Sequence, residues 1–133
     1  MKNPNNPCLF CNTSKKEIIF ENDLAFVTFD SYPVSQFHSL IIPKRHIQNY
    51  FDLTNDELLA CHGLLLKIKN KINSDDNTVG GFNIGANSER IAGQSILHCH
   101  IHLIPRREGD VDNPQGGVRS VIPSRQHYVH KSK

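Results

Sequence analysis

In His98-Cys99-His100-Ile101-His102-Leu103-Ile104-Pro105, histidine alternates with apolar residues, and this alternation is the clearest structural pattern in the chain. Successive side chains of a β-strand point to opposite faces of the sheet. We therefore expect a strand over residues 95–104 whose three imidazoles share one face. Cys99, Ile101 and Leu103 then point to the other face. One pattern thus predicts both a core-facing surface and a polar, functional surface.

A long helix is expected to cover the apolar face of that strand. Thr54-Asn55-Asp56-Glu57 has the form of a capping box, in which Thr54 accepts from a backbone amide and Glu57 reaches back. Apolar residues then recur at helical spacing up to about Ile72. The stripe predicted to face the core is Leu58, Leu59, Cys61, His62, Leu65, Leu66 and Ile68.

The remaining strands are short and closely spaced along the chain. Residues 17–30 contain two β-rich runs split by Glu21-Asn22-Asp23, which is typical of a hairpin. Residues 39–42 and 80–87 predict two further strands, and 88–94 a polar loop. Strands before and after one helix indicate an α+β fold, an antiparallel sheet of about five strands with a long flanking helix. Residues 111–133, the C-terminal tail, have no clear period, and we expect an ordered loop that wraps the domain.

The whole chain sets limits on domain number and partners. Its 133 residues fit a single domain over 1–133. A net charge of +2 argues against a nucleic-acid coat, although a local cluster can still hold a small anion. No apolar run approaches the length that crosses a bilayer, and no signal peptide is visible. We therefore expect a soluble, cytoplasmic protein without a membrane or nucleic-acid partner, with order lost only at the polar ends 1–7 and 128–133.

The histidines of the 98–102 segment suit chemistry at phosphorus. A neutral imidazole nitrogen is a competent nucleophile near pH 7, provided that the other ring nitrogen is tied to an acceptor. Flanking histidines can donate to phosphate oxygens or transfer protons. Just upstream, Gly93 permits close backbone approach, and Gln94 and Ser95 offer an amide and a hydroxyl as donors. The segment therefore predicts a phosphate-handling site.

Metal binding is the main alternative for these residues. His-x-His on a strand is a common zinc platform, and a catalytic zinc would need a third ligand and an activated water. Cys8-x-x-Cys11 reads as a metal or redox pair, whereas Cys61 and Cys99 lie in apolar surroundings and are expected to be buried small hydrophobes. Spacing alone does not separate a nucleophile from a metal ligand.

The sequence resembles the histidine triad (HIT) family. His98, His100 and His102 followed by Leu103-Ile104 match the family motif. Residues 38–46, His-Ser-Leu-Ile-Ile-Pro-Lys-Arg-His, are similar to the other signature strand. Cys8-Leu9-Phe10-Cys11 resembles the start of many bacterial members. Pro105–Asp110, which follows the histidine motif, resembles the corresponding segment of dinucleoside-polyphosphate hydrolases. The resemblance covers about 8–110, the motif-bearing core.

The resemblance implies a nucleotide-cleaving enzyme and assigns roles to its residues. His100 matches the nucleophile, which attacks the α-phosphorus and forms a nucleotidyl-histidine that water then hydrolyses to a nucleoside monophosphate. His102 is implied to contact the phosphate and to take part in catalysis. The other implied nucleotide- and phosphate-binding residues are Asp30 (ribose hydroxyls), Asn87, Gln94 and Ser95.

A structural zinc ion and a homodimer are also implied. Some members hold zinc with residues that match Cys8, Cys11, His46 and His98 here. Four protein ligands close the coordination sphere, so such a site is structural and not catalytic.

Several functions remain open within the resemblance. Hydrolysis of dinucleoside polyphosphates, such as diadenosine tetraphosphate, is favoured by Pro105–Asp110. Cleavage of nucleoside phosphoramidates is the alternative, although the tryptophan-containing tail of that branch is missing, since the chain has no Trp. Phosphorolysis and a non-enzymatic nucleotide-binding role are further possibilities. The nucleotidyltransferase branch is disfavoured, because it carries glutamine where His102 stands.

Overall fold

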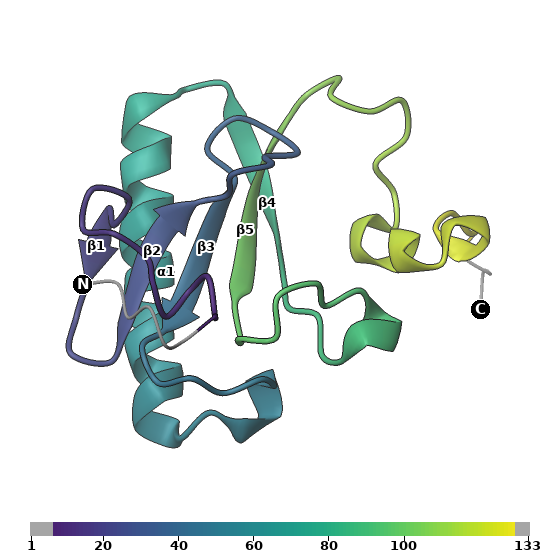
Figure 1. Ribbon diagram of the computed structural model, residues 1–133. Helices are drawn as coiled ribbons and strands as arrows, with labels where there is room; N and C mark the ends of the chain where they lie inside the picture. Colours follow the sequence, from purple (N-terminus) through teal and green to yellow (C-terminus); the bar gives the residue numbers. More distant parts are fainter. Residues whose placement is uncertain (1–6, 130–133) are drawn as a thin grey trace.

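A computed structural model describes residues 7–129. Five strands form one antiparallel sheet, and a single long helix packs against it (Figure 1). The fold is therefore the α+β arrangement that the sequence predicts. Almost all of the polar ends, for which disorder was predicted, lies outside the described residues.

The sheet has the strand order β1-β2-β3-β5-β4. Its strands are β1 (Phe20–Glu21), β2 (Ala25–Phe29), β3 (Ser39–Pro43), β4 (Val79–Gly85) and β5 (Ile101–Arg107). Strands β1 and β2 form the predicted hairpin, and the Asn22 side chain closes its turn by accepting from the amides of Leu24 and Ala25. The register between β3 and β5 sets Leu40 opposite His102, which brings the two signature segments side by side.

The helix α1 (Asn55–Asp75) begins with the predicted capping box, since Thr54 accepts from the Glu57 amide and the Glu57 carboxylate accepts from the Thr54 amide. It ends three residues later than expected. The stripe that faces the core was predicted incorrectly in part, because Leu58, Leu59 and Leu66 are exposed. His62 is also exposed. The buried apolar positions are Cys61, Leu64, Ile68 and Ile72.

Alternation along the strands divides the apolar residues between two faces. Ile101 and Leu103 pack with α1 in the main core, as the alternation predicts, together with Ala25, Val27 and Ile41. The opposite face carries a smaller cluster of Phe26, Leu40 and Ile42. Cys61 and Cys99 are buried, and burial raises their thiol pKa to about 12 and about 11, so both behave as the expected small hydrophobes.

The prediction of a strand from Ser95 is wrong, because β5 begins only at Ile101. The Cys99 amide donates to the carbonyl of Ile47, at 2.7 Å, and so this residue bonds to the segment after β3 instead of to a neighbouring strand. His98 and His100 therefore precede the strand, and His102 alone of the three lies within it. Strand β4 likewise ends at Gly85, before the expected Asn87.

The tail does not wrap the domain as predicted. It leaves β5, turns away from the sheet and forms two short 3-10 helices, η3 (Gly117–Val121) and η4 (Pro123–Arg125) (Figure 1). Within the tail, Arg119 donates to the carbonyl of Arg125 and lies over the ring of Tyr128. Local contacts of this kind give the tail its own structure.

Across residues 7–129, no helix combines the length and the apolar character needed to cross a bilayer.

Candidate functional site

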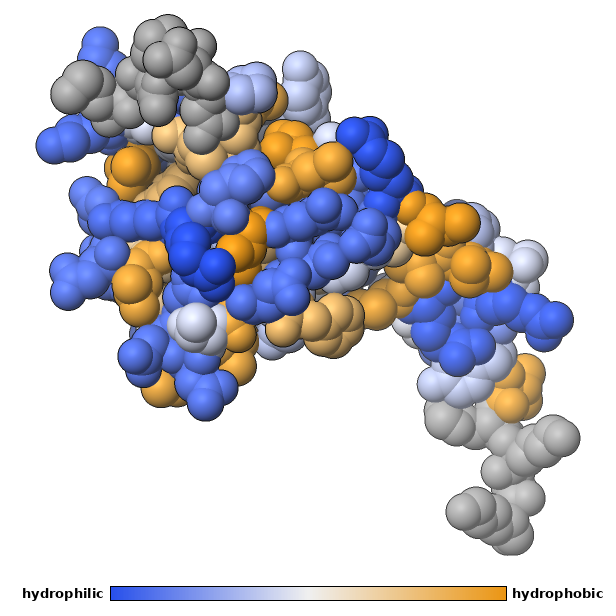
Figure 2. Space-filling model, turned by 60° about the horizontal axis from the view of Figure 1, so that its bottom comes forward, coloured by the Kyte–Doolittle hydropathy of each residue, from blue (hydrophilic) through white to orange (hydrophobic). Residues whose placement is uncertain are grey.

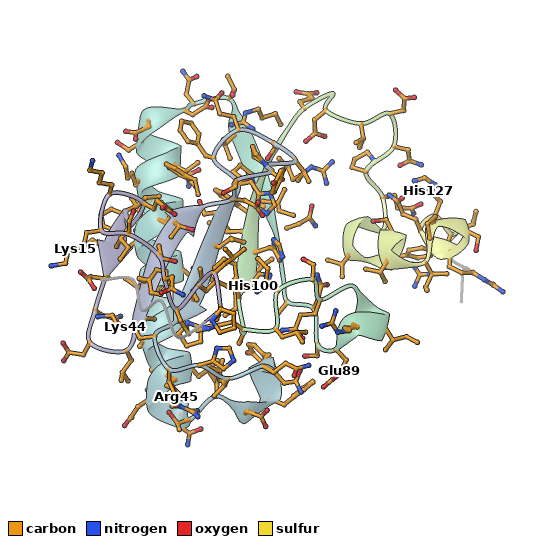
Figure 3. All side chains as sticks on the ribbon, viewed as in Figure 1. Lys15, Lys44, Arg45, Glu89, His100 and His127 are labelled. Atoms are coloured by element: carbon orange, nitrogen blue, oxygen red, sulfur yellow. The ribbon has the colours of Figure 1, made fainter. Side chains whose placement is uncertain are left out.

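His100 lies in the interior beside the start of β5 (Figure 3). Its ring is buried, and its Nδ1 lies 2.7 Å from the carbonyl oxygen of His98. A carbonyl oxygen only accepts, so Nδ1 carries the hydrogen of a neutral ring and Nε2 keeps its lone pair. This is the arrangement that a nucleophilic imidazole requires.

His102 is fixed in the other tautomer by His38, a residue at the entrance to β3. The Val34 amide donates to Nδ1 of His38, so the hydrogen of a neutral His38 is on Nε2. That Nε2 lies 2.8 Å from Nδ1 of His102 and donates to it. The hydrogen of a neutral His102 is then on its Nε2. The chain of donors runs from Val34 through His38 to His102.

Asp30, at the end of β2, lies beside this pair. Its Oδ2 is 3.5 Å from Nε2 of His38 and 3.9 Å from Nδ1 of His102, while its Oδ1 accepts from the Tyr32 amide. Burial lowers the pKa of His102 to about 4, assisted by the neighbouring rings of His100 and His38. Burial also lowers the pKa of His38, and Asp30 opposes that shift. Both imidazoles are therefore neutral at pH 7.

Asp30, His38 and His102 also have the residue types of a metal site. Their hydrogen bonds do not suit one. The Nε2 of His38 carries the hydrogen that it donates, and a cation would have to displace it while the Val34 amide occupies Nδ1. We interpret this cluster as a hydrogen-bond chain that orients His102.

A second cluster consists of Cys8, Cys11, His46 and His98, and its geometry does suit a metal ion. The Nδ1 atom of His98 lies 3.3 Å from Cys8 Sγ, 3.5 Å from Cys11 Sγ and 3.2 Å from His46 Nδ1. His46 Nδ1 is 3.3 Å from Cys11 Sγ. A tetrahedral ion with bonds of about 2.05 Å to nitrogen and about 2.3 Å to sulfur separates its ligand atoms by about 3.3–3.8 Å. The four residues therefore fit one metal ion.

The far side of the His98 ring supports this assignment. Its Nε2 lies 2.7 Å from the carbonyl oxygen of Pro43, so that nitrogen carries the hydrogen and Nδ1 presents a lone pair to the cluster. Metal-bound histidines usually donate their second ring nitrogen in this way. Burial lowers the pKa of His98, which favours the neutral, ligating form.

The loop before the triad is tied to the segment that follows β3. Gln94 is buried; its Oε1 accepts from the Glu89 amide, and its Nε2 donates to the carbonyl of Gln48. Gly93 has φ of +99°, and Asn87 lies against it. Ser95 is exposed. The expected phosphate-binding roles of Asn87, Gln94 and Ser95 stay predictions, and Gln94 also holds the loop together.

The arginines of the Pro105–Asp110 segment are engaged within the protein. Arg106 forms a two-pronged ion pair with Asp110, with both distances 2.7 Å, and donates to Asn83. Arg107 donates to Asp76 at 2.9 Å. This flank therefore has a structural role in joining β5 to β4 and to the helix end.

Residues 12–109 match the HIT domain family. The chain belongs to the HIT family. Its relatives include an uncharacterised HIT-like protein of Methanocaldococcus jannaschii, 32% identical over 77% of this chain and 81% of that protein. An adenosine 5′-monophosphoramidase of Candida albicans is 32% identical, over 76% and 71% of the two chains. An adenylylsulfatase of Arabidopsis thaliana is 35% identical over 79% of this chain and 55% of that protein.

Solved structures support the same assignment. A HIT family protein from Bacillus anthracis superposes with a TM-score of 0.71 at 32% identity, over 79% of this chain and 77% of that one. A zinc-bound histidine triad family protein from Mycobacterium smegmatis gives 0.69 at 27% identity, over 78% of each chain.

Two residues of this HIT protein were missed as site residues from the sequence. His38 belongs to the signature segment 38–46, but only the pairing of β3 with β5 shows that it bonds to His102. Phe10 was part of the Cys8–Cys11 motif, and its ring centroid lies 4.9 Å from that of His100. Neither contact has a local sequence signal, because each joins segments far apart in the chain.

Proposed function

We propose that this HIT protein is a hydrolase that cleaves nucleotides at the α-phosphate through a nucleotidyl-His100 intermediate. The observation that carries the proposal is the hydrogen bond from His100 Nδ1 to the His98 carbonyl, which leaves Nε2 as a free nucleophile. A buried and oriented imidazole loses little entropy when it attacks.

The steps follow from the tautomers. His100 Nε2 attacks the α-phosphorus, and the bond to the leaving group breaks as the new P–N bond forms. His102 Nε2–H is the donor to a phosphate oxygen or to the leaving group, because His38 occupies its other nitrogen. Water then attacks the nucleotidyl-histidine, restoring His100 and releasing a nucleoside monophosphate. In this proposal Asp30 binds the ribose hydroxyls, and Asn87, Gln94 and Ser95 contact phosphate.

Dinucleoside polyphosphates are the proposed substrates, with nucleoside phosphoramidates as a second candidate. The first rests on the similarity of Pro105–Asp110 to that branch. The second gains support from the Candida relative, which is named a monophosphoramidase, and from the pairing of Arg106 with Asp110 and of Arg107 with Asp76. Arginines held by carboxylates are poorly placed to bind a long polyphosphate.

Zinc is the proposed metal at Cys8, Cys11, His46 and His98. Two thiolates and two imidazoles are ligands that zinc prefers, and the zinc-bound mycobacterial relative supports the same choice. Bound there, zinc would hold the N-terminal segment against His98, two residues before the nucleophile. Two ligating thiols suit a cytoplasmic location, where cysteines stay reduced.

A homodimer is proposed around β4, which is an edge strand of the sheet. Edge strands offer unpaired backbone groups. Ile84 on β4 is half exposed and borders a cavity of about 360 Å³ that is also lined by Phe51 and Leu58. Three apolar residues of the tail, Val118, Val121 and Ile122, are also exposed. Figure 2 shows apolar side chains on the surface of the projecting part of the molecule. A second copy of the chain would cover such surfaces. Ile84→Lys should shift the equilibrium from dimer toward monomer, as measured by analytical ultracentrifugation.

The activity is tested by following AMP release from diadenosine tetraphosphate and, separately, from an adenosine phosphoramidate. His100→Ala should lower the rate by about a thousandfold or more with its preferred substrate. His127→Ala, a tail variant, is the matched control and should match wild type. Binding of nucleotide without turnover of either substrate would instead support a non-enzymatic role.

A further inference from the structure

Phe10 lies between the metal-binding cysteines in sequence and beside the proposed nucleophile in space. Its ring meets His100 edge-to-face, with centroids 4.9 Å apart and an interplanar angle of 70°. The same ring meets His98 at 5.9 Å and 87°. Phe10 therefore contacts both His98, a proposed metal ligand, and His100, the proposed nucleophile.

Phe10 is also anchored to the sheet. It packs against the cluster of Phe26, Leu40 and Ile42. The turn that carries it is closed by the Asn12 side chain, which donates to the Cys8 carbonyl at 2.8 Å. A metal held by Cys8 and Cys11 would fix both ends of this turn. The ring between them would then be held against His100 and the Phe26, Leu40 and Ile42 cluster.

We propose that Phe10 is a positioning residue for His100, and that metal bound at Cys8, Cys11, His46 and His98 holds Phe10 in place. The His98 carbonyl fixes which nitrogen of His100 carries the hydrogen, and the Phe10 ring fixes the plane of the imidazole. Metal occupancy then controls the step in which His100 attacks phosphorus. This inference rests on the proposed function of His100.

The test compares Phe10→Ala, Phe10→Leu and Phe10→Tyr at saturating zinc. Loss of the ring should lower kcat by about tenfold to a hundredfold while KM changes little, because misorientation of a nucleophile affects the reaction step. Phe10→Tyr keeps an aromatic ring and should therefore retain most of the wild-type kcat. Leu9→Ala is the matched control, since Leu9 belongs to the same turn but is 67% exposed.

Metal removal provides the second arm. Chelation should slow wild type about as much as Phe10→Ala, and the two changes together should cost little more than either alone, as expected for coupled groups. Without the Phe10 ring the imidazole can rotate away from the His98 carbonyl, which would release the hydrogen bond that fixes its tautomer. Ring ¹⁵N NMR of His100 at fixed pH needs no substrate, and should show a single Nδ1–H tautomer in zinc-loaded wild type and a mixture in Phe10→Ala. Phe10→Leu serves these measurements if the alanine variant fails to fold.

Three outcomes would overturn the proposal. An unchanged kcat and tautomer in both Phe10→Ala and Phe10→Leu would show that the ring positions nothing. A raised KM with normal kcat would make Phe10 a substrate-binding surface. Additive effects of metal removal and mutation would separate the metal from Phe10. If wild type turned over no nucleotide, the proposed function would fail, while the NMR comparison would still decide the role of Phe10.

Discussion

Two histidine clusters lie on either side of His100, and they use the same side chain in different ways. In the cluster with Cys8 and Cys11, the Nδ1 atoms of His46 and His98 converge on one point. In the cluster with Asp30, His38 and His102 face each other as donor and acceptor. The second nitrogen of the ring decides the difference: His98 donates outward to Pro43, whereas His38 accepts from Val34. The hydrogen bond behind a histidine thus selects a metal ligand or a proton donor.

Among the changes that distinguish the two clusters, disruption of the metal cluster should affect the protein most. Cys8→Ser should lose the metal, and the unfolding free energy should fall by about 3 kcal/mol or more, because metal-binding energy is also folding energy. Asp30→Asn is the control from the other cluster and should keep full metal content. Metal content by mass spectrometry together with thermal unfolding checks both. Metal retained in Cys8→Ser and lost in Asp30→Asn would reverse the assignment of the clusters.

A smaller effect is expected from pH, through His102. Its pKa is lowered from 6.5 to about 4 by burial, so the unfolded chain binds a proton at a higher pH than the folded protein does. Its contribution to stability is complete above about pH 6.5 and is lost as the pH falls toward 4. The loss should be on the order of 3 kcal/mol.

Wild type and His102→Gln, compared at each pH, isolate this effect, since both keep the metal ligands. Between pH 6.5 and pH 4, the unfolding free energy of wild type should fall by about 3 kcal/mol more than that of His102→Gln. Parallel curves across that range would contradict a depressed pKa at His102.

The alternation at Ile101 and Leu103 predicted the core-facing side of β5 correctly, because strand periodicity is a local property of the chain. Cys99 is also buried as expected, but it precedes the strand. The start of the strand could not be predicted in the same way. His98 is held by Pro43 and by partners from the N-terminal segment, and these override the extended pattern. The capping box at Thr54 was likewise predictable, whereas the exposure of Leu58 and Leu59 depends on what lies next to the helix.

The site residues likewise divide into those with a local sequence pattern and those whose roles depend on contacts between distant segments. The three histidines of the motif and Cys8-x-x-Cys11 are visible as spacings. The role of His38 depends on the register of β3 against β5, which a single sequence does not carry. Arg45 is another residue without a local signal: its guanidinium donates to buried Glu57 and lowers the pKa of that carboxyl to about 2.

The smallest of these effects is expected at His38. His38→Ala removes the donor to His102 Nδ1 and lets the ring adopt either tautomer, so kcat should fall by about tenfold. Metal content should stay at the wild-type level, because His38 contributes nothing to the other cluster. His127→Ala, which removes an exposed histidine bonded to the Asn113 carbonyl, is the control. Normal kcat in His38→Ala would show that the hydrogen-bond chain is dispensable.

In the proposed mechanism, His100 becomes covalently attached to the nucleotide. Rapid mixing of the protein with its preferred substrate, an alkaline quench and mass spectrometry of peptides test it most directly. We expect a nucleotidyl adduct on the peptide that contains His100, formed within the first turnover and missing in His100→Asn. Full turnover without an adduct, at a rate that His100→Asn retains, would contradict it.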